Sequence, residues 1–165
     1  HRGAAGPAGM ILRAFAPSDR DWLIARHRSL SGAEFGFTPD FGDSIADKLD
    51  AFLAREDPVK RLWIAGESGQ RIGSIAVSGR DGSAFLNFVL LEPSARGRGL
   101  GHVLLQSAID HARAAGFPEA RLETYSCLTA ARALYRAHGF AIVDSDPGWR
   151  RFGQVFDREL WQRRL

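Results

Sequence analysis

The stretch EPSARGRGLGHVLL, residues 92–105, places three glycines and two arginines between a proline and the start of an apolar run. Glycine lowers helix stability and arginine is bulky, so this pattern does not serve helix formation alone. The residues before Glu92 form a strand-like run, and residues 101–116 read as a helix. The stretch therefore predicts a strand, a glycine-rich turn and a helix that begins at this turn.

A turn of this kind is suited to bind an anion. The first N–H groups of a helix lack partners within the helix, and the helix dipole adds partial positive charge there. Glycines let a phosphate approach the main chain, and Arg96 and Arg98 can add charge-assisted hydrogen bonds. We therefore predict that the backbone of residues 96–101 binds a pyrophosphate.

Two common nucleotide-binding motifs do not fit this turn. The dinucleotide fingerprint G-x-G-x-x-G would need a third glycine at position 102 after Gly97 and Gly99, but the chain has His102 there. A P-loop would need the sequence G-K-S/T, which the chain lacks. The pyrophosphate is thus expected to belong to another kind of ligand.

Composition favours one globular domain. The chain has 165 residues, of which 45% are hydrophobic and 25% charged, with no apolar run near the roughly 18 residues of a membrane span. Residues 1–9, HRGAAGPAG, read as a linker or expression remnant, and residues 10–165 as a single domain. Cys127 is the only cysteine, which favours a reducing, cytoplasmic location.

Charge and histidine placement exclude other classes of site. The net charge of +3 fits an anionic small ligand better than nucleic acid, which calls for a denser basic stripe. The five histidines are scattered, and no Cys/His cluster has metal-ligand spacing, so no metal is expected.

The order of predicted elements indicates a mixed α/β (α+β) fold. Hydrophobic spacing predicts helices over 18–30, 44–56, 101–116 and 128–139, with a long loop over 32–43. Strands are predicted over 10–16, 61–67, 71–79, 83–92, 119–125, 140–145 and 150–162. This order predicts a mixed sheet with helices on its faces and local parallel pairing late in the chain.

Two motifs resemble the GCN5-related N-acetyltransferase (GNAT) family. RGRGLG matches its R/Q-x-x-G-x-G/A signature with Arg96, Gly99 and Gly101, and ALYRAHGF, residues 133–140, resembles its A-x-x-L-Y-x-x-x-G-F segment. The resemblance extends over Met10–Trp161. It implies a central, mostly antiparallel sheet of about seven strands, splayed between the fourth and fifth strands and flanked by about four helices.

The resemblance also implies a cosubstrate, acetyl-coenzyme A, in the splayed gap. Its pyrophosphate would lie on the turn, and its pantetheine arm would pair with the fourth strand near Val89–Leu91. The implied cofactor-binding residues are Val89, Leu90, Leu91, Arg96, Gly97, Arg98, Gly99, Leu100, Gly101, Ser126 and Tyr135. Leu128 stands where many members have a cofactor-binding asparagine, and Ser126 is the substitute we predict.

The implied reaction is direct attack of an amine on the thioester in a ternary complex. Tyr135 matches the family tyrosine that assists the departing thiolate. Phe85 and Asn87 occupy the strand where many relatives carry a glutamate, so Glu34 is our first candidate for general base, with His27 and Glu123 as second choices and a water relay as an alternative. The predicted acceptor pocket contains His27, Glu34, Phe35 and Phe37, with Phe41 as a further wall residue.

A closer similarity involves acetyltransferase domains fused to MarR-type regulators. ARHRSLSGAEFGF, residues 25–37, and FGQVFDRELW, residues 152–161, look like the first helix and last strand of those domains. The predicted function is N-acetylation of a small-molecule, amino acid or peptide amine. The alternative is a non-catalytic acyl-coenzyme A sensor that is fused to or associated with such a regulator. Homodimerisation is left open.

Overall fold

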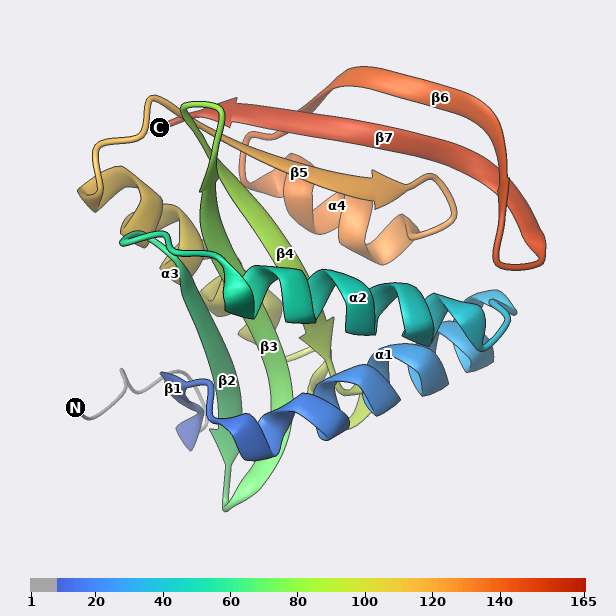
Figure 1. The fold of residues 1–165 in the computed structure, drawn as a ribbon, viewed down its shortest axis with the longest axis horizontal. Coiled ribbons are helices and arrows are strands. Elements are labelled where there is room, and N and C mark those ends of the chain that lie inside the picture. The colour runs from blue at the N-terminus through green and yellow to red at the C-terminus, as the bar shows by residue number, and fades with distance from the viewer. Residues whose placement is uncertain (1–8) are drawn as a thin grey trace.

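The computed structural model describes residues 9–165, and the elements follow the predicted order (Figure 1). The expectation of a linker over residues 1–9 falls, apart from Gly9, outside the described residues. The strands are β1 Ile11–Ala14, β2 Arg61–Glu67, β3 Gln70–Arg80, β4 Ser83–Leu91, β5 Glu119–Tyr125, β6 Ala141–Arg151 and β7 Gln154–Arg164. The helices are α1 Arg20–Phe35, α2 Asp40–Ala54, α3 Leu100–Ala114 and α4 Thr129–Ala137.

The strands form one sheet in the order β1-β2-β3-β4-β5-β7-β6. Every neighbouring pair is antiparallel except β4 and β5, which are parallel. The α3 crossover connects these two parallel strands, as a parallel pair requires. The predicted fold class, a mostly antiparallel mixed sheet of seven strands with four helices, is confirmed.

The helices cover the two faces of the sheet (Figure 1). On one face, α3 and α4 pack on a mainly aliphatic cluster that includes Leu86, Leu104 and Leu122. On the other, α1 and α2 pack on a cluster rich in aromatic rings, including Phe37 and Phe156. We call these the aliphatic face and the aromatic face.

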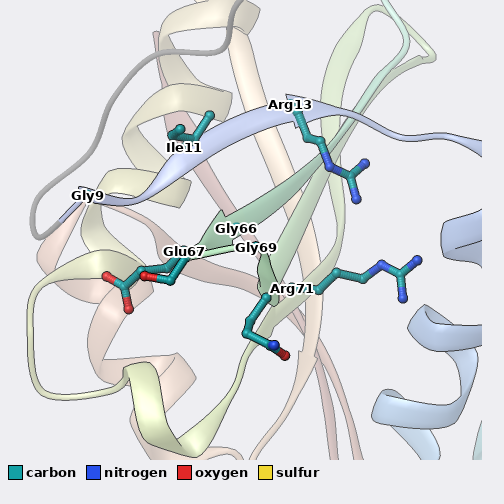
Figure 2. A pocket seen from close by; sticks show the side chains of 9 residues that line it. Gly9, Ile11, Arg13, Gly66, Glu67, Gly69 and Arg71 are labelled. Carbon is teal, nitrogen blue, oxygen red and sulfur yellow. The ribbon is translucent and has the colours of Figure 1, made fainter.

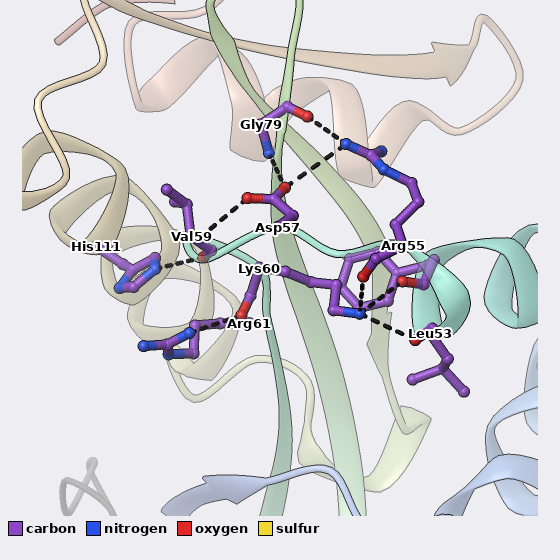
Figure 3. Close-up of polar contacts among 9 residues, drawn as sticks. Leu53, Arg55, Asp57, Val59, Lys60, Arg61, Gly79 and His111 are labelled. Carbon is purple, nitrogen blue, oxygen red and sulfur yellow. Dashed lines mark hydrogen bonds and ion pairs between the residues drawn. The ribbon is translucent and has the colours of Figure 1, made fainter.

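Polar contacts fix the segment between α2 and β2 (Figure 3). The Lys60 Nζ donates hydrogen bonds to the carbonyl oxygens of Phe52, Leu53 and Arg55, which satisfies acceptors at the end of α2. The Asp57 carboxylate accepts from the Gly79 N–H at 2.7 Å, near the end of β3. These contacts hold the end of α2 against the sheet.

Two sequence predictions are wrong at their boundaries. The loop over 32–43 shrinks to four residues, because α1 continues to Phe35 and α2 already begins at Asp40. Gly36 ends α1 in a left-handed conformation, with φ 71°. Gly42, which suggested a loop, lies inside α2, where a Cβ atom would collide with the Arg28 side chain. That glycine serves helix packing.

The second wrong boundary concerns the last two strands. β6 runs to Arg151, so Arg150 and Arg151 belong to β6 and not to the final strand. Pro147 and Gly148 lie inside β6, where the β6–β7 register shifts between Asp146 and Trp149. A bulge takes up these two residues, and pairing resumes beyond it.

Candidate active site

β4 contains a bulge in its pairing with β3. Ser74 pairs with Leu90 and Ala76 with Asn87, so Phe88 and Val89 together lie opposite Ile75. Phe88 has φ 51°, a region that bulky residues rarely occupy, and its carbonyl accepts a hydrogen bond from the Ser74 hydroxyl at 2.6 Å. A bulge bends its strand, so the strained residue marks where β4 turns away.

The parallel pairing of β4 with β5 is short. It covers three residue pairs, from Ala84–Ala120 to Leu86–Leu122. Beyond them, Val89–Leu91 of β4 and Glu123–Tyr125 of β5 continue without pairing to each other. The two strands therefore leave unpaired backbone groups on both sides of a gap, as the resemblance predicted.

The turn after β4 presents free amide groups. Gly97 and Gly99 have φ values of 75° and 77°, and a Cβ atom on either would meet no atom within 4 Å. These glycines thus serve the backbone conformation, and the space beside them is open. Within residues 9–165, no backbone carbonyl accepts from residues 97–102, since the first helical bond runs from Val103 to Gly99. The Arg96 N–H donates to the Pro93 carbonyl at 3.2 Å.

Carboxylates hold the side chains of both turn arginines. Arg96 donates to both oxygens of Glu34, at 2.9 and 2.7 Å, and Arg98 pairs with Glu67 of β2. A second bidentate pair joins Arg26 to Glu92, with both hydrogen bonds at 2.7 Å. Two ion pairs therefore tie α1 to the β4–α3 turn, and Glu34 lies beside this turn with both oxygens engaged.

Tyr135 lies on the aliphatic face, where only 5% of its surface is exposed. Its ring packs against Trp161 and Phe140, at centroid distances of 6.3 Å each. Burial raises the pKa of the Tyr135 phenol above its ordinary value, so the group is protonated at neutral pH. No residue in the described chain forms a hydrogen bond with its hydroxyl, which leaves this donor available.

His27 lies on the opposite, aromatic face beside the bulge. Its ring packs edge-on against Phe88, with centroids 6.4 Å apart, and its Nδ1 is 2.8 Å from the Leu23 carbonyl. That carbonyl can only accept, so Nδ1 carries the proton and Nε2 is the free acceptor. Burial lowers the pKa of His27 to about 4, which keeps the ring neutral at pH 7.

The predicted acceptor residues from the α1–α2 turn lie mostly in the aromatic cluster. Phe37 is buried and packs against Phe35 and Phe41. Sequence reasoning missed the rings that complete this cluster: Tyr125, Trp149, Phe152 and Phe156. No signal pointed to Tyr125, but the strong aromatic content of residues 149–156 could have indicated the other three rings. They dock the β6–β7 hairpin against the α1–α2 turn, where the Thr38 N–H donates to the Phe152 carbonyl at 3.1 Å.

Ser126 and Glu123, the remaining candidates, both contact β7. The Ser126 hydroxyl accepts from the Asp157 N–H at 2.8 Å. Glu123 pairs with Arg158 at 3.3 Å. Glu123 also borders a cavity of about 290 Å³, which is lined by Arg80, Phe85, Glu123, Asp144, Ser145, Asp146, Arg158 and Leu160.

Comparison with known proteins identifies the family. The sequence pattern of the Acetyltransferase (GNAT) family matches residues 24–140. The chain belongs to the GNAT family. The N-acetyltransferase YjgM of Escherichia coli K12 is 31% identical over 144 residues, which cover 84% of this chain and 86% of YjgM. The mycothiol acetyltransferase of Streptomyces avermitilis is 30% identical over 146 residues, 85% of this chain, but the match spans only 46% of that protein.

Solved GNAT structures share the fold. The GCN5-related N-acetyltransferase of Kribbella flavida superimposes with a TM-score of 0.77 at 22% identity, covering 97% of this chain and 100% of that one. The yncA protein of Salmonella typhimurium, solved with its cofactor acetyl-CoA, gives a TM-score of 0.70 at 19% identity, covering 96% of this chain and 95% of that one. The predicted GNAT-type acetyltransferase is thus confirmed at the level of family and fold.

A second cavity of this GNAT domain, about 220 Å³, lies at the β1 edge of the sheet (Figure 2). It is lined by the β2–β3 turn together with Gly9, Ile11, Arg13 and Arg71. Its position on the outer strands separates it from the β4–β5 gap. Across residues 9–165, no three His, Cys, Asp or Glu side chains converge as a metal site, and no helix has the length and apolar character to cross a membrane.

Proposed function

We propose that this GNAT protein transfers the acetyl group of acetyl-coenzyme A to a primary amine of a small molecule, amino acid or peptide, by direct attack in a ternary complex. One observation carries the proposal: a turn of free amides adjoins a gap in which β4 no longer pairs with β5. Amides at a helix start suit a pyrophosphate, and an unpaired strand edge suits the amide-bearing pantetheine arm.

The chain offers a place for each part of the cosubstrate. The N–H groups of residues 97–101 would hold the pyrophosphate, and the backbone of Val89–Leu91 would pair with the pantetheine arm. The thioester supplies the activated acyl group. An N–H on the bulged part of β4 could then stabilise the developing oxyanion, and holding both reactants in one gap lowers the entropic barrier.

Tyr135 is suited to donate a hydrogen bond, and His27 is suited to accept a proton. The Tyr135 hydroxyl is protonated and has no hydrogen-bond partner among residues 9–165, so it can donate a hydrogen bond to the leaving sulfur. Its raised pKa favours hydrogen-bond donation over complete proton transfer. The neutral His27 presents Nε2 as an acceptor for the amine proton, directly or through water. We propose these roles together with Ser126 as a cofactor contact.

Glu34 remains a candidate base on one condition. Both of its oxygens accept hydrogen bonds from Arg96, so neither is free to accept a proton from an amine while this pair is intact. A pyrophosphate on the turn would compete with Glu34 for Arg96, because both are anions that suit a guanidinium group. Glu34 could act as a base only after that exchange, which would order the reaction with acetyl-coenzyme A first.

The acceptor would enter from the aromatic face, where α1 and the β6–β7 hairpin meet. An amine acceptor agrees with the N-acetyltransferase name of YjgM. The mycothiol acetyltransferases are about twice as long as the match, so they support the chemistry and leave the acceptor open. Association with a MarR-type regulator, homodimerisation and a cytoplasmic location remain predictions from the sequence.

A turnover assay tests the proposal. Release of free thiol from acetyl-coenzyme A would be followed across amino acids, polyamines, aminoglycosides and peptides. With a responsive amine, Tyr135→Phe should lower kcat by about 100-fold, the range for loss of one positioned proton donor. Calorimetry should show unchanged affinity of this variant for coenzyme A.

The sensor alternative rests on a specific observation. β4 carries the apolar Phe85 and the uncharged Asn87 near the gap, and the nearby Glu34 is ion-paired. Tight coenzyme A binding without thiol release for any amine would favour a sensor over an enzyme. Absence of coenzyme A binding would contradict both functions.

A further inference from the structure

One buried hydroxyl in the described chain has no hydrogen-bond partner. Thr124 is 4% exposed, and its Oγ1 is the only fully buried side-chain nitrogen or oxygen within residues 9–165 that no protein atom satisfies. An unsatisfied buried polar group costs about 1–3 kcal/mol, and nearly all such groups in folded proteins are paired. A valine would fill the same volume without this cost and suits a strand equally well.

Thr124 lies on β5 just after the last pair with β4. That pair is Leu86–Leu122, and Thr124 is two residues further, on the same side of β5 as Leu122. Leu122 belongs to the aliphatic cluster that also contains Tyr135. The hydroxyl is therefore on the Tyr135 side of the sheet, where β5 borders the gap.

The neighbouring strand does not supply a partner. Thr124 is opposite Glu159 of β7, whose carboxylate is equally buried. Glu159 already accepts two hydrogen bonds from Arg132, at 2.9 and 3.0 Å, and one from the Trp161 indole at 3.1 Å. On its other side, β5 has no strand beside Thr124. Thr124 thus lies on the unpaired edge of β5, which borders the space that the proposed function assigns to the pantetheine arm.

We propose that Thr124 binds an amide group of the pantetheine arm of coenzyme A through its hydroxyl. This inference rests on the proposed function. The arm carries two amides, and a hydroxyl can donate to an amide oxygen or accept from an amide N–H. The contact would anchor the arm from β5, opposite the backbone contacts from β4. Thr124 would then be a positioning residue that sets cofactor affinity and takes no part in the chemistry.

The isosteric variant Thr124→Val separates this role from a structural one. Removal of the unpaired hydroxyl should raise the urea midpoint of the free protein. Calorimetry should show that Thr124→Val binds coenzyme A about 3–10-fold more weakly than the wild type, which is the contribution of one neutral hydrogen bond. The loss should be the same for acetyl-coenzyme A. Thr124→Ser keeps the hydroxyl and should bind coenzyme A within about two-fold of the wild type.

Thr38→Val is the matched control, because it makes the same substitution at an exposed position between α1 and α2. It should leave coenzyme A affinity unchanged. Unchanged affinity in Thr124→Val, or lower stability of the free variant, would overturn the inference. A loss confined to acetyl-coenzyme A would place the hydroxyl on the thioester and would overturn the assignment to the arm. A wild type that binds no coenzyme A would instead refute the proposed function.

Discussion

The two faces of the sheet differ in how they are built. The aliphatic face is assembled mainly from consecutive segments, because β4, the turn, α3 and β5 follow each other in the chain. The aromatic face joins segments that are far apart, such as Phe37 of the α1–α2 turn and Phe152 of the β6–β7 turn, whose centroids lie 5.5 Å apart. The proposed cofactor site is built from segments that are consecutive in the chain, and the proposed acceptor site from segments that are far apart.

This difference separates two kinds of specificity. A diphosphate is recognised by backbone groups that any chain can present once glycines allow the turn. The acceptor side depends on which rings and charges meet across long sequence distances. Changes on the aromatic face should therefore alter acceptor use, while changes at the turn should alter coenzyme A affinity.

The largest expected effect comes from truncation in the aromatic cluster. Phe37→Ala should lower the free energy of unfolding by about 3–5 kcal/mol, since a buried ring leaves a cavity. Equilibrium urea unfolding measures this loss. Leu104→Ala, the matched change on the aliphatic face, should cost about 2–5 kcal/mol.

The comparison is sharpened by ligand measurements on the same two variants, at a temperature where both are folded. Phe37→Ala should raise the KM of the acceptor with little change in coenzyme A affinity. Leu104 is buried near the start of α3, shortly after the turn, so Leu104→Ala should show the reverse pattern. The same pattern in both variants would contradict a division of labour between the faces.

An effect of intermediate size is expected on stability when the pH is lowered. Burial lowers the pKa of His27 to about 4 from an ordinary 6.5, with Lys48 acting in the same direction. Between these values the unfolded chain binds more protons, so stability should fall by about 2–3 kcal/mol as pH drops from 6.5 to 4. Urea midpoints at pH 7, 5.5 and 4 would measure this slope.

His27→Asn should flatten the slope while retaining a donor for the Leu23 carbonyl. Titration of Asp19 should not contribute to the change in stability between pH 6.5 and 4. Hydrogen bonds from Arg13 lower the pKa of Asp19 to about 2 from 3.8, so its contribution is present above pH 4 and is lost only as pH falls from about 4 to 2. An equally steep slope in His27→Asn would show that another group titrates.

The smallest effect tests the ion pair between α1 and the turn. Glu34→Gln should free Arg96 and tighten coenzyme A binding by about 2–5-fold, the usual worth of an exposed ion pair. Calorimetry measures this change. Asp43→Asn removes the same charge from an exposed pair with Arg28 and should have no effect. A fall in kcat of about 100-fold for Glu34→Gln, at unchanged affinity, would instead support Glu34 as the general base.

The sequence by itself determined the element order, the amide-rich turn and the family, because each depends on residues that are close in the chain. Gly97 and Gly99 permit the left-handed backbone of the turn because they lack a Cβ atom, and the hydrophobic period marks α3 without knowledge of its neighbours. The sequence predicted that the backbone of residues 96–101 binds the pyrophosphate, but the Arg96 N–H already donates to the Pro93 carbonyl. This bond belongs to a 3₁₀ turn over Pro93–Ala95 that the sequence did not predict.

Only the tertiary structure decided which side chains are free. It paired Glu34 with Arg96, packed Phe37 among rings from the last hairpin and left the Thr124 hydroxyl without a partner in the described part of the chain. It also turned Gly42 from an expected loop residue into a contact between α1 and α2. Such outcomes depend on contacts between distant segments, and these contacts exist only after the two faces of the sheet have been covered.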